Sequence, residues 1–263
     1  RLDSVHSAFT SYFGGRLSLA PLQGASVKRV LELGSGSGAW AIEASRLFPQ
    51  AEVVAVDLFP IPDRTVPSNL RFLQHDLTQP LPFAKESFDV IHARLIMIHL
   101  PDVEKVLERT IELLKPGGWL LIEDPDEDAH DTDRGCRTLV QNCPLVRLLQ
   151  DIMRSKGADP CVARRLETLI QSSEQFDEVN VRRVIVPMCG QDVAPAENAL
   201  GKVWRATYKV TAADLAARYS EHGITPEVFK QFSDMLNCPD AGLISDLYFT
   251  WSKKRCDRDE RTV

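Results

Sequence analysis

The sequence predicts an α/β fold in which helices cover both faces of a parallel sheet. Short apolar segments alternate with helical segments, and glycine, proline or polar residues separate them. The apolar segments are nearly continuous, which is typical of strands buried on both faces of a parallel sheet. Five such strands are expected in the first half of the chain, at residues 28–33, 52–57, 70–74, 88–93 and 119–124.

The chain opens with an amphipathic segment, residues 1–20. Apolar and aromatic residues recur at helical spacing, and Gly14-Gly15 is expected to end this helix before a second short helical stretch that reaches Pro21. One interpretation is a leader helix packed on the core. The alternative is a lid over a ligand, in which case His6 would face the substrate.

Helices are expected between the strands. The first runs from about Ala39 to Phe48 and stops at Pro49, and another runs from near Asp102 to Leu114. Lys115-Pro116-Gly117-Gly118 is expected to form a sharp turn.

The second half of the chain predicts helical additions to the same sheet. Helices are expected around 134–156, 160–172, 192–222 and 226–236, with strands at 179–188 and 241–251. No repeat or linker divides the chain, so a single domain is predicted. It comprises the leader at 1–20, a cofactor-binding core at 28–125, helical lid insertions at 126–172 and 190–238, and a final strand at 241–254.

Composition narrows the classes of partner. The 263 residues carry a formal charge of -6 and have a sequence pI near 5.6, so no nucleic-acid partner is expected. Six cysteines without a C-x-x-C pair give no support for a metal site. No apolar run is long enough to cross a membrane, and we expect a cytoplasmic location, with a nuclear one as the alternative.

The glycine-rich stretch Glu32-Leu33-Gly34-Ser35-Gly36-Ser37-Gly38 joins the first strand to a helix. Glycine accepts positive φ there and lets a ligand approach the backbone, while free N–H groups at the helix start can donate. Its spacing differs from the G-x-G-x-x-G of a dinucleotide site, which argues against NAD. Asp57, an acid about 20 residues further on, is placed to accept from a ribose diol, although it could instead cap the next turn.

Further motifs follow in order: Asp76-Leu77, Phe88-Asp89-Val90-Ile91 and Leu114-Lys115-Pro116-Gly117-Gly118. With the glycine turn and Asp57, the region from about Lys28 to Asp124 resembles the class I S-adenosylmethionine-dependent methyltransferases. The resemblance implies a Rossmann-like, seven-stranded sheet whose last strand is antiparallel. It also implies S-adenosyl-L-methionine as cofactor and S-adenosyl-L-homocysteine as product.

The resemblance assigns a role to individual residues. The amino-acid and ribose part of the cofactor would lie on Gly34, Ser35 and Gly36, with Gly38 in the same turn and Glu32 as its orienter. The ribose hydroxyls would bind Asp57. The adenine would contact Leu58, Asp76 and Leu77, and the methionine part would lie beside Ala93 and Arg94.

A narrower resemblance rests on Arg1-Leu2-Asp3-Ser4-Val5-His6, the G-x-G-x-W-A-I-E turn around Trp40, Phe88 to Arg94, and Tyr248-Phe249-Thr250-Trp251. These motifs look like those of the LaeA-like branch of fungal methyltransferases. That branch is linked to secondary metabolism, through regulators or through pathway enzymes that methylate small natural products. This chain has Leu95-Ile96-Met97-Ile98-His99 where many members have an asparagine-rich loop.

The predicted function is methyl transfer to a small, partly apolar acceptor, through oxygen or nitrogen. The alternatives are a regulatory module that acts through a protein partner, and a protein methyltransferase. Positioning supplies much of the rate of methyl transfer, and a base is needed only where the acceptor must lose a proton.

His99, at the mouth of the fourth strand, is the first candidate base, followed by His92, and then by His130 and by Glu123 or Asp124. His99 could instead only begin a helix, and His92 could be a core residue. The acids at 124–128 form either a solvated loop or a rim that favours a cationic acceptor.

Overall fold

The alternation of strands and helices produces a seven-stranded sheet in the computed structural model, which describes residues 1–127, 143–188, 194–238 and 244–256. The strand order is β3-β2-β1-β4-β5-β7-β6, and β7 runs antiparallel to both of its neighbours. The predicted fold class, with an antiparallel last strand, is confirmed. The strands are β1 (Arg29–Leu33), β2 (Glu52–Asp57), β3 (Leu70–Gln74), β4 (Phe88–Arg94), β5 (Leu114–Asp126), β6 (Phe176–Pro187) and β7 (Ile244–Lys254).

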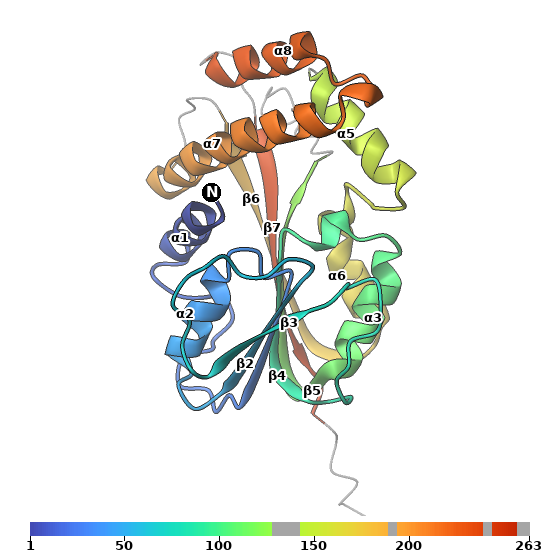
Figure 1. Cartoon of the computed structure of the whole chain (residues 1–263). Helices are drawn as coiled ribbons and strands as arrows, with labels where there is room; N and C mark the ends of the chain where they lie inside the picture. The colour runs from blue at the N-terminus through green and yellow to red at the C-terminus, as the bar shows by residue number, and fades with distance from the viewer. Residues whose placement is uncertain (128–142, 189–193, 239–243, 257–263) are drawn as a thin grey trace, which may run out of the picture.

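Helices lie on both faces of the sheet and beyond one of its ends (Figure 1). They are α1 (Leu2–Tyr12), α2 (Ala39–Leu47), the 3-10 helix η1 (Met97–His99), α3 (Val103–Leu113), α5 (Pro144–Ser155), α6 (Val162–Ser172), α7 (Pro195–Arg218), the 3-10 helix η2 (Ser220–His222) and α8 (Pro226–Asn237). None of the helices in the described ranges combines the length and apolar character needed to cross a bilayer.

Alternate residues of the central strands build two separate cores. Leu31 and Ile91 face α3 and α6, whereas Val30 and Val90 face α2 on the other side. Because side chains alternate across a strand, both sets are apolar only when both faces are covered. This explains the continuous apolar segments in the sequence.

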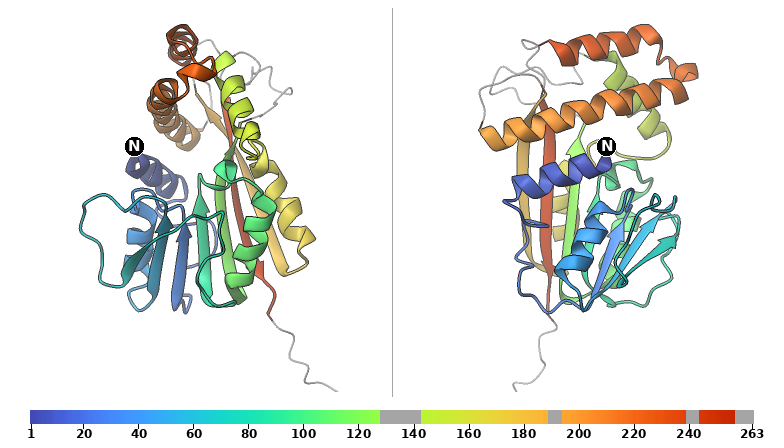
Figure 2. Two further views of the ribbon diagram at one scale, coloured as in Figure 1. Left: turned by 45° about the vertical axis from the view of Figure 1, so that its right-hand side comes forward. Right: turned by 60° about the vertical axis from the view of Figure 1, so that its left-hand side comes forward.

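A third core lies beyond the carboxyl ends of the parallel strands. There α5, α7 and α8 stack above the sheet and α1 lies beneath α7, an arrangement visible from two directions in Figures 1 and 2. Aromatic rings join these elements to β7: Phe9 of α1 stacks on Trp204 of α7 at 6.1 Å and meets Phe249 edge-on at 5.2 Å.

Some local expectations differ from the structure. Residues 16–20 are not helical, because Leu17 and Ala20 pack on α2 as irregular chain, and Trp40 donates to the Leu17 carbonyl. The turn expected at 115–118 is a bulge within β5, where the register shifts against β4. Residues 134–142 and 241–243, expected in a helix and a strand, lie outside the described ranges.

Helix α6 lies within the stretch 126–172 that was expected to form part of the lid. In the structure it belongs instead to the helix layer that covers the sheet. Val162, Leu166 and Ile170 of α6 are buried in the same core as α3. The helices placed beyond the sheet end are therefore α5, α7 and α8, together with α1.

Candidate active site

The glycine turn between β1 and α2 forms the floor of the candidate cofactor site. Gly34, Gly36 and Gly38 have φ values of +70°, +51° and +74°, a region that costs other residues strain. Added Cβ atoms would lie 2.7 Å from Ile96, 2.7 Å from Leu2 and 2.8 Å from Ile61, respectively. The backbone thus favours glycine at all three positions, and at Gly34 the Ile96 Cβ, 3.0 Å from an added Cβ, excludes a side chain as well.

Two acids fix the turn in place. The buried Glu32 carboxylate accepts from the Ala41 N–H at 3.1 Å, which ties the end of β1 to the first turn of α2. At the end of β2, Asp57 accepts from the Gly36 N–H at 2.8 Å and from the Phe59 N–H at 3.1 Å. Both acids therefore lie where the sequence places them, at the carboxyl ends of adjacent parallel strands.

The segment after Asp57 is the exposed side of the site. Leu58 and Phe59 are 52% and 75% exposed, which is unusual for large apolar side chains beside a polar loop. Asp76 is exposed, and a hydrogen bond from the Thr78 N–H lowers the pKa of its carboxyl. Leu77, by contrast, is buried in the core beside α3.

The residues present fit an adenosyl amino acid. The Ser35 hydroxyl and Arg94 Nη2 are buried without a hydrogen-bond partner among the described residues, an arrangement that costs free energy unless a ligand supplies partners. Asp57 and Asp76 offer acceptors, Arg94 offers a donor, and Leu58 offers an apolar surface. Ala93 lies at the end of β4 and is fully buried.

Beneath this site, on the α2 face of the sheet, lies a row of three buried polar residues: Glu32, His92 and Glu123. His92 is fully buried and stacks on Trp40, with ring centroids 3.8 Å apart and planes at 7°. Its ring nitrogens lie 3.7 Å from Glu32 and 3.8 Å from Glu123, too far for hydrogen bonds, and neither nitrogen has another partner among the described residues. The structure therefore places His92 in the core and not in the lining of the 380 Å³ cavity beyond β4.

Arg94 links that row to α1. Its Nε donates to Glu123 at 2.5 Å, and its Nη1 lies 3.0 Å from His6 Nδ1. Burial alone would raise the pKa of Glu123, but Arg94 and His92 beside it hold the pKa below the ordinary value. Burial and the Arg94 charge lower the pKa of His6, so a neutral imidazole accepts from Arg94 and donates to Glu43 at 2.5 Å.

A cavity of about 380 Å³ opens next to this end of β4. Its walls come from the segment after Arg94, the end of β5, and helices α5, α7 and α8. Most lining side chains are apolar; they include Leu95, Ile98, Leu145, Val146, Leu149, Ile152, Met153, Trp204, Leu215 and Phe232. The polar groups include His99, Glu127, Gln150, Thr207 and Tyr208.

His99 lies at this cavity, as its position after β4 suggested. Its side chain is open to the cavity, and loss of water around the ring lowers the pKa of the imidazole. Asp124 supports η1, the 3-10 helix that contains His99, because its side-chain Oδ2 accepts from the Met97 N–H at 3.2 Å. Of the other candidate bases, Glu123 pairs with Arg94, and His130 lies outside the described ranges.

Two polar residues of the cavity escape sequence reasoning. Glu127 follows β5 directly and accepts from the hydroxyl of Tyr208, a residue of α7. Burial raises the pKa of Glu127 to about 7, although the Tyr208 hydrogen bond opposes the shift. The pair is 81 residues apart in the sequence, and only an acid in the loop after β5 hinted at it.

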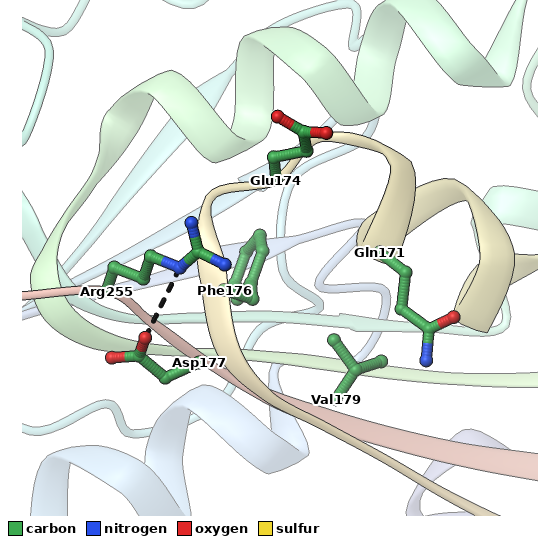
Figure 3. Close-up of a pocket in the computed structure, with 6 residues that line it drawn as sticks. All are labelled: Gln171, Glu174, Phe176, Asp177, Val179 and Arg255. Atoms are coloured by element: carbon green, nitrogen blue, oxygen red, sulfur yellow. Dashed lines mark ion pairs between the residues drawn. The ribbon is translucent and has the colours of Figure 1, made fainter.

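A separate hollow of about 510 Å³ lies where β6 begins and β7 ends, at the opposite end of the sheet (Figure 3). Its six lining residues include one exposed ion pair, in which Arg255 Nε lies 3.3 Å from Asp177. An exposed pair of this kind contributes little energy and brings no reactive group together.

The sheet order, the glycine turn and the acids at the ends of β2 and β3 define a class I S-adenosylmethionine-dependent methyltransferase. A family model described as a methyltransferase domain matches residues 5–154, more than half of the chain. The chain therefore belongs to this methyltransferase family.

Curated relatives support the narrower resemblance to fungal secondary metabolism. The chain is 37% identical to methyltransferase str2 of Strobilurus tenacellus, covering 88% of this chain and 83% of the relative. It is also 37% identical to str3 of the same organism, with 97% and 92% covered. The secondary metabolism regulator laeA of Coprinopsis cinerea is 29% identical, with 75% and 52% covered.

Solved structures share the fold at low sequence identity. Phosphoethanolamine N-methyltransferase 2 of Haemonchus contortus, solved with S-adenosyl-L-methionine, superposes with a TM-score of 0.57. The two chains are 17% identical, and the match covers 96% of this chain and 57% of the other. This likeness concerns the fold alone.

Proposed function

We propose that this chain transfers a methyl group from S-adenosyl-L-methionine to a small, largely apolar secondary metabolite. The observation that carries the proposal is the adjacency of two sites along β4. Ala93 and Arg94 end the strand at the cofactor side, and Leu95 begins the wall of the 380 Å³ cavity. Donor and acceptor would thus meet at one strand end, which is where open α/β sheets bind ligands.

The cofactor would be held by the glycine turn, Asp57, Asp76 and Arg94, and it would supply a methyl group on a sulfonium ion. Asp57 would accept from the ribose diol in place of the Gly36 N–H it now binds. The buried Arg94 Nη2, which has no partner among the described residues, would donate to the carboxylate of the amino-acid part. Leu58 would cover one face of the adenine.

The cavity would orient the acceptor and exclude water. Its apolar side chains favour an uncharged carbon skeleton, and few polar groups are available to fix its orientation. His99, whose pKa lies below the ordinary value, is neutral at physiological pH and could accept a proton.

A regulatory role through a protein partner is the alternative, and the similarity to laeA supports it. A cavity walled by α5, α7 and α8 favours a small acceptor over a protein chain, because a protein side chain needs an open groove.

The test combines cofactor binding and label transfer. We expect S-adenosylhomocysteine to bind the folded chain in isothermal titration, and Asp57→Ala to weaken binding roughly tenfold or more by removing the ribose acceptor. With methyl-labelled cofactor and separated fractions of a fungal extract, label should enter the small-molecule fraction. Absence of cofactor binding, or label in protein only, would contradict the proposal.

A further inference from the structure

We propose that Glu127, held in place by Tyr208, is the group in the cavity that binds the acceptor's hydroxyl and takes its proton, so that the cavity selects a neutral phenol or enol over a carboxylate. This inference rests on the proposed function and names the class of substrate. It differs from the expectation that His99 alone serves as the base.

The backbone of Glu127 is fixed on both sides. Its N–H donates to the Pro160 carbonyl at 3.1 Å, and its own carbonyl accepts from Gln150 Nε2 at 2.8 Å. These bonds tie the end of β5 to α5 and to the segment before α6. The backbone is thus held in place, and the side chain lines the cavity and bonds to Tyr208, which gives the fixed position that catalysis requires.

The carboxylate of Glu127 is anchored but not neutralised. Its Oε1 accepts from the Tyr208 hydroxyl, and no ion-pair partner of Glu127 occurs in the described ranges. The preceding acid behaves differently: Asp126 forms two bonds with Arg164 and faces away from the cavity lining. A carboxylate has about four acceptor positions, so Glu127 can still accept from a ligand hydroxyl.

Apolar rings enclose the pair. Trp204 lies 5.7 Å from the Tyr208 ring and Phe232 lies 6.4 Å from it, and all three residues line the cavity. In such surroundings two ionised carboxylates repel each other more strongly than in water, because the apolar lining weakens screening. A second carboxylate is therefore disfavoured beside Glu127, whereas a neutral hydroxyl can donate to it.

The charged and titratable groups around Glu127 fit this role. The charge of Asp126 next to it raises the pKa of Glu127 and the hydrogen bond from the Tyr208 hydroxyl lowers it, and Cys143, directly before α5, is close enough to be affected by the Glu127 charge. His99 shares the cavity lining, and Lys156 at the rim donates to Tyr219 at 2.7 Å. Burial raises the pKa of the Glu127 carboxyl to about 7, a value suited to a base that acts near neutral pH.

The step assigned to Glu127 is a proton transfer. The acceptor O–H bond breaks, its electron pair stays on oxygen and becomes available for the bond to the methyl carbon, and the proton bonds to a carboxylate oxygen of Glu127. The protonated carboxyl then returns its proton to water once the product leaves. This proton transfer needs no oxidant and no metal.

The test uses two bicyclic probes that differ in one group: 2-naphthol and 2-naphthoate. Each is titrated calorimetrically into the full chain saturated with S-adenosylhomocysteine at pH 8, where Glu127 is ionised. We expect 2-naphthol to bind at least roughly tenfold more tightly than 2-naphthoate. Glu127→Gln, which keeps the shape but not the charge, should reduce this preference to about threefold or less.

Glu108→Gln is the matched control, because it makes the same substitution at an exposed position of α3 that does not line the cavity. It should leave the preference unchanged, and unchanged S-adenosylhomocysteine affinity shows that each variant is folded. The inference is overturned if 2-naphthoate binds as tightly as 2-naphthol, if Glu127→Gln leaves the preference intact, or if neither probe binds. Failure of S-adenosylhomocysteine itself to bind would instead reject the proposed function.

Discussion

His6 Nδ1 lies 3.0 Å from Arg94 Nη1, and this contact joins the helix at the start of the described chain to the end of β4, 88 residues later. The same Arg94 guanidinium lies 4.8 Å from the centre of the Phe9 ring. Helix α1 is therefore attached to the strand end where cofactor and acceptor would meet. Its first residues, Leu2 and Asp3, reach the glycine turn, where Asp3 accepts from the Ser37 hydroxyl at 2.6 Å.

Loss of the contact between His6 and Arg94 should loosen helix α1 where it lies over the glycine turn. In His6→Ala, Arg94 and Glu43 both lose a hydrogen-bond partner, and Leu2 is no longer held over Gly36. We expect the free energy of unfolding to fall by about 1–3 kcal/mol and S-adenosylhomocysteine to bind roughly tenfold more weakly. Urea denaturation and calorimetry measure the two effects. His222→Ala, in the exposed η2, is the control and should change neither quantity.

A methyl group at Gly36 should damage the cofactor site specifically. Gly36 has φ +51°, and its added Cβ would lie 2.7 Å from Leu2 Cδ1, so Gly36→Ala strains the backbone of the turn and displaces the end of the Leu2 side chain that lies over it. Gly24 provides a matched control, since its φ is +75° and an added Cβ would meet nothing within 4 Å. Both variants should lose about 1–2 kcal/mol of stability from backbone strain. Only Gly36→Ala should lose S-adenosylhomocysteine binding in calorimetry, and equal affinity in the two variants would contradict this account of the turn.

The sequence predicts the cofactor side of the site because that side is built from neighbouring residues and strand ends. Gly34, Gly36 and Gly38 are needed by the backbone itself, and Asp57 follows a recognisable strand. His92 shows the limit of this reasoning. Its place near the end of β4 suggests a site residue, but the alternation of side chains directs it to the face covered by Trp40.

The acceptor side could not be predicted in the same way. Glu127 belongs to an acidic stretch that is typical of a solvated loop, and only the packing of α5 and α7 encloses it. In the sequence, nothing distinguishes Tyr208 from the other residues of a long helix. Its role depends on the angle at which α7 crosses the sheet end, and this angle is set by tertiary contacts such as Phe9 with Trp204.

The pH dependence of methyl transfer should distinguish Glu127 from His99. Glu127 must be ionised to accept a proton, so kcat/KM for a phenol is expected to rise with pH through about 7. The pKa of His99 is lowered from 6.5, so a rise due to His99 would occur below that value. Tyr208 and Asp126 influence the Glu127 pKa and stay in place in both variants below.

We expect Glu127→Gln to abolish the rise through about 7 and to reduce kcat by roughly 10²-fold or more, the usual contribution of a general base. His99→Gln should keep the rise. A profile that is unchanged in Glu127→Gln but lost in His99→Gln would assign the base to His99 instead.

Asp124 should make the stability of the fold fall as pH increases. Burial raises the pKa of its carboxyl well above the ordinary value of 3.8, so the folded state holds a proton that the unfolded chain releases more readily. The raised pKa of Asp124 does not change the free energy of unfolding below pH 3.8, and the loss of stability grows as pH rises from there toward the pKa of the folded state. Over that range, stability falls by at most about 1.4 kcal/mol per pH unit.

Asp124→Asn removes the ionisable group and keeps an oxygen that can accept from the Met97 N–H. We expect the variant to match the parent near pH 4 and to exceed it in free energy of unfolding above pH 7, in urea titrations at both values. Asp63→Asn, at an exposed position, is the control and should follow the parent at both. A variant that is less stable than the parent above pH 7 would mean that the ionised carboxylate is needed to hold η1. In that case His99 and Ile96 would also shift, and S-adenosylhomocysteine affinity would fall with the stability.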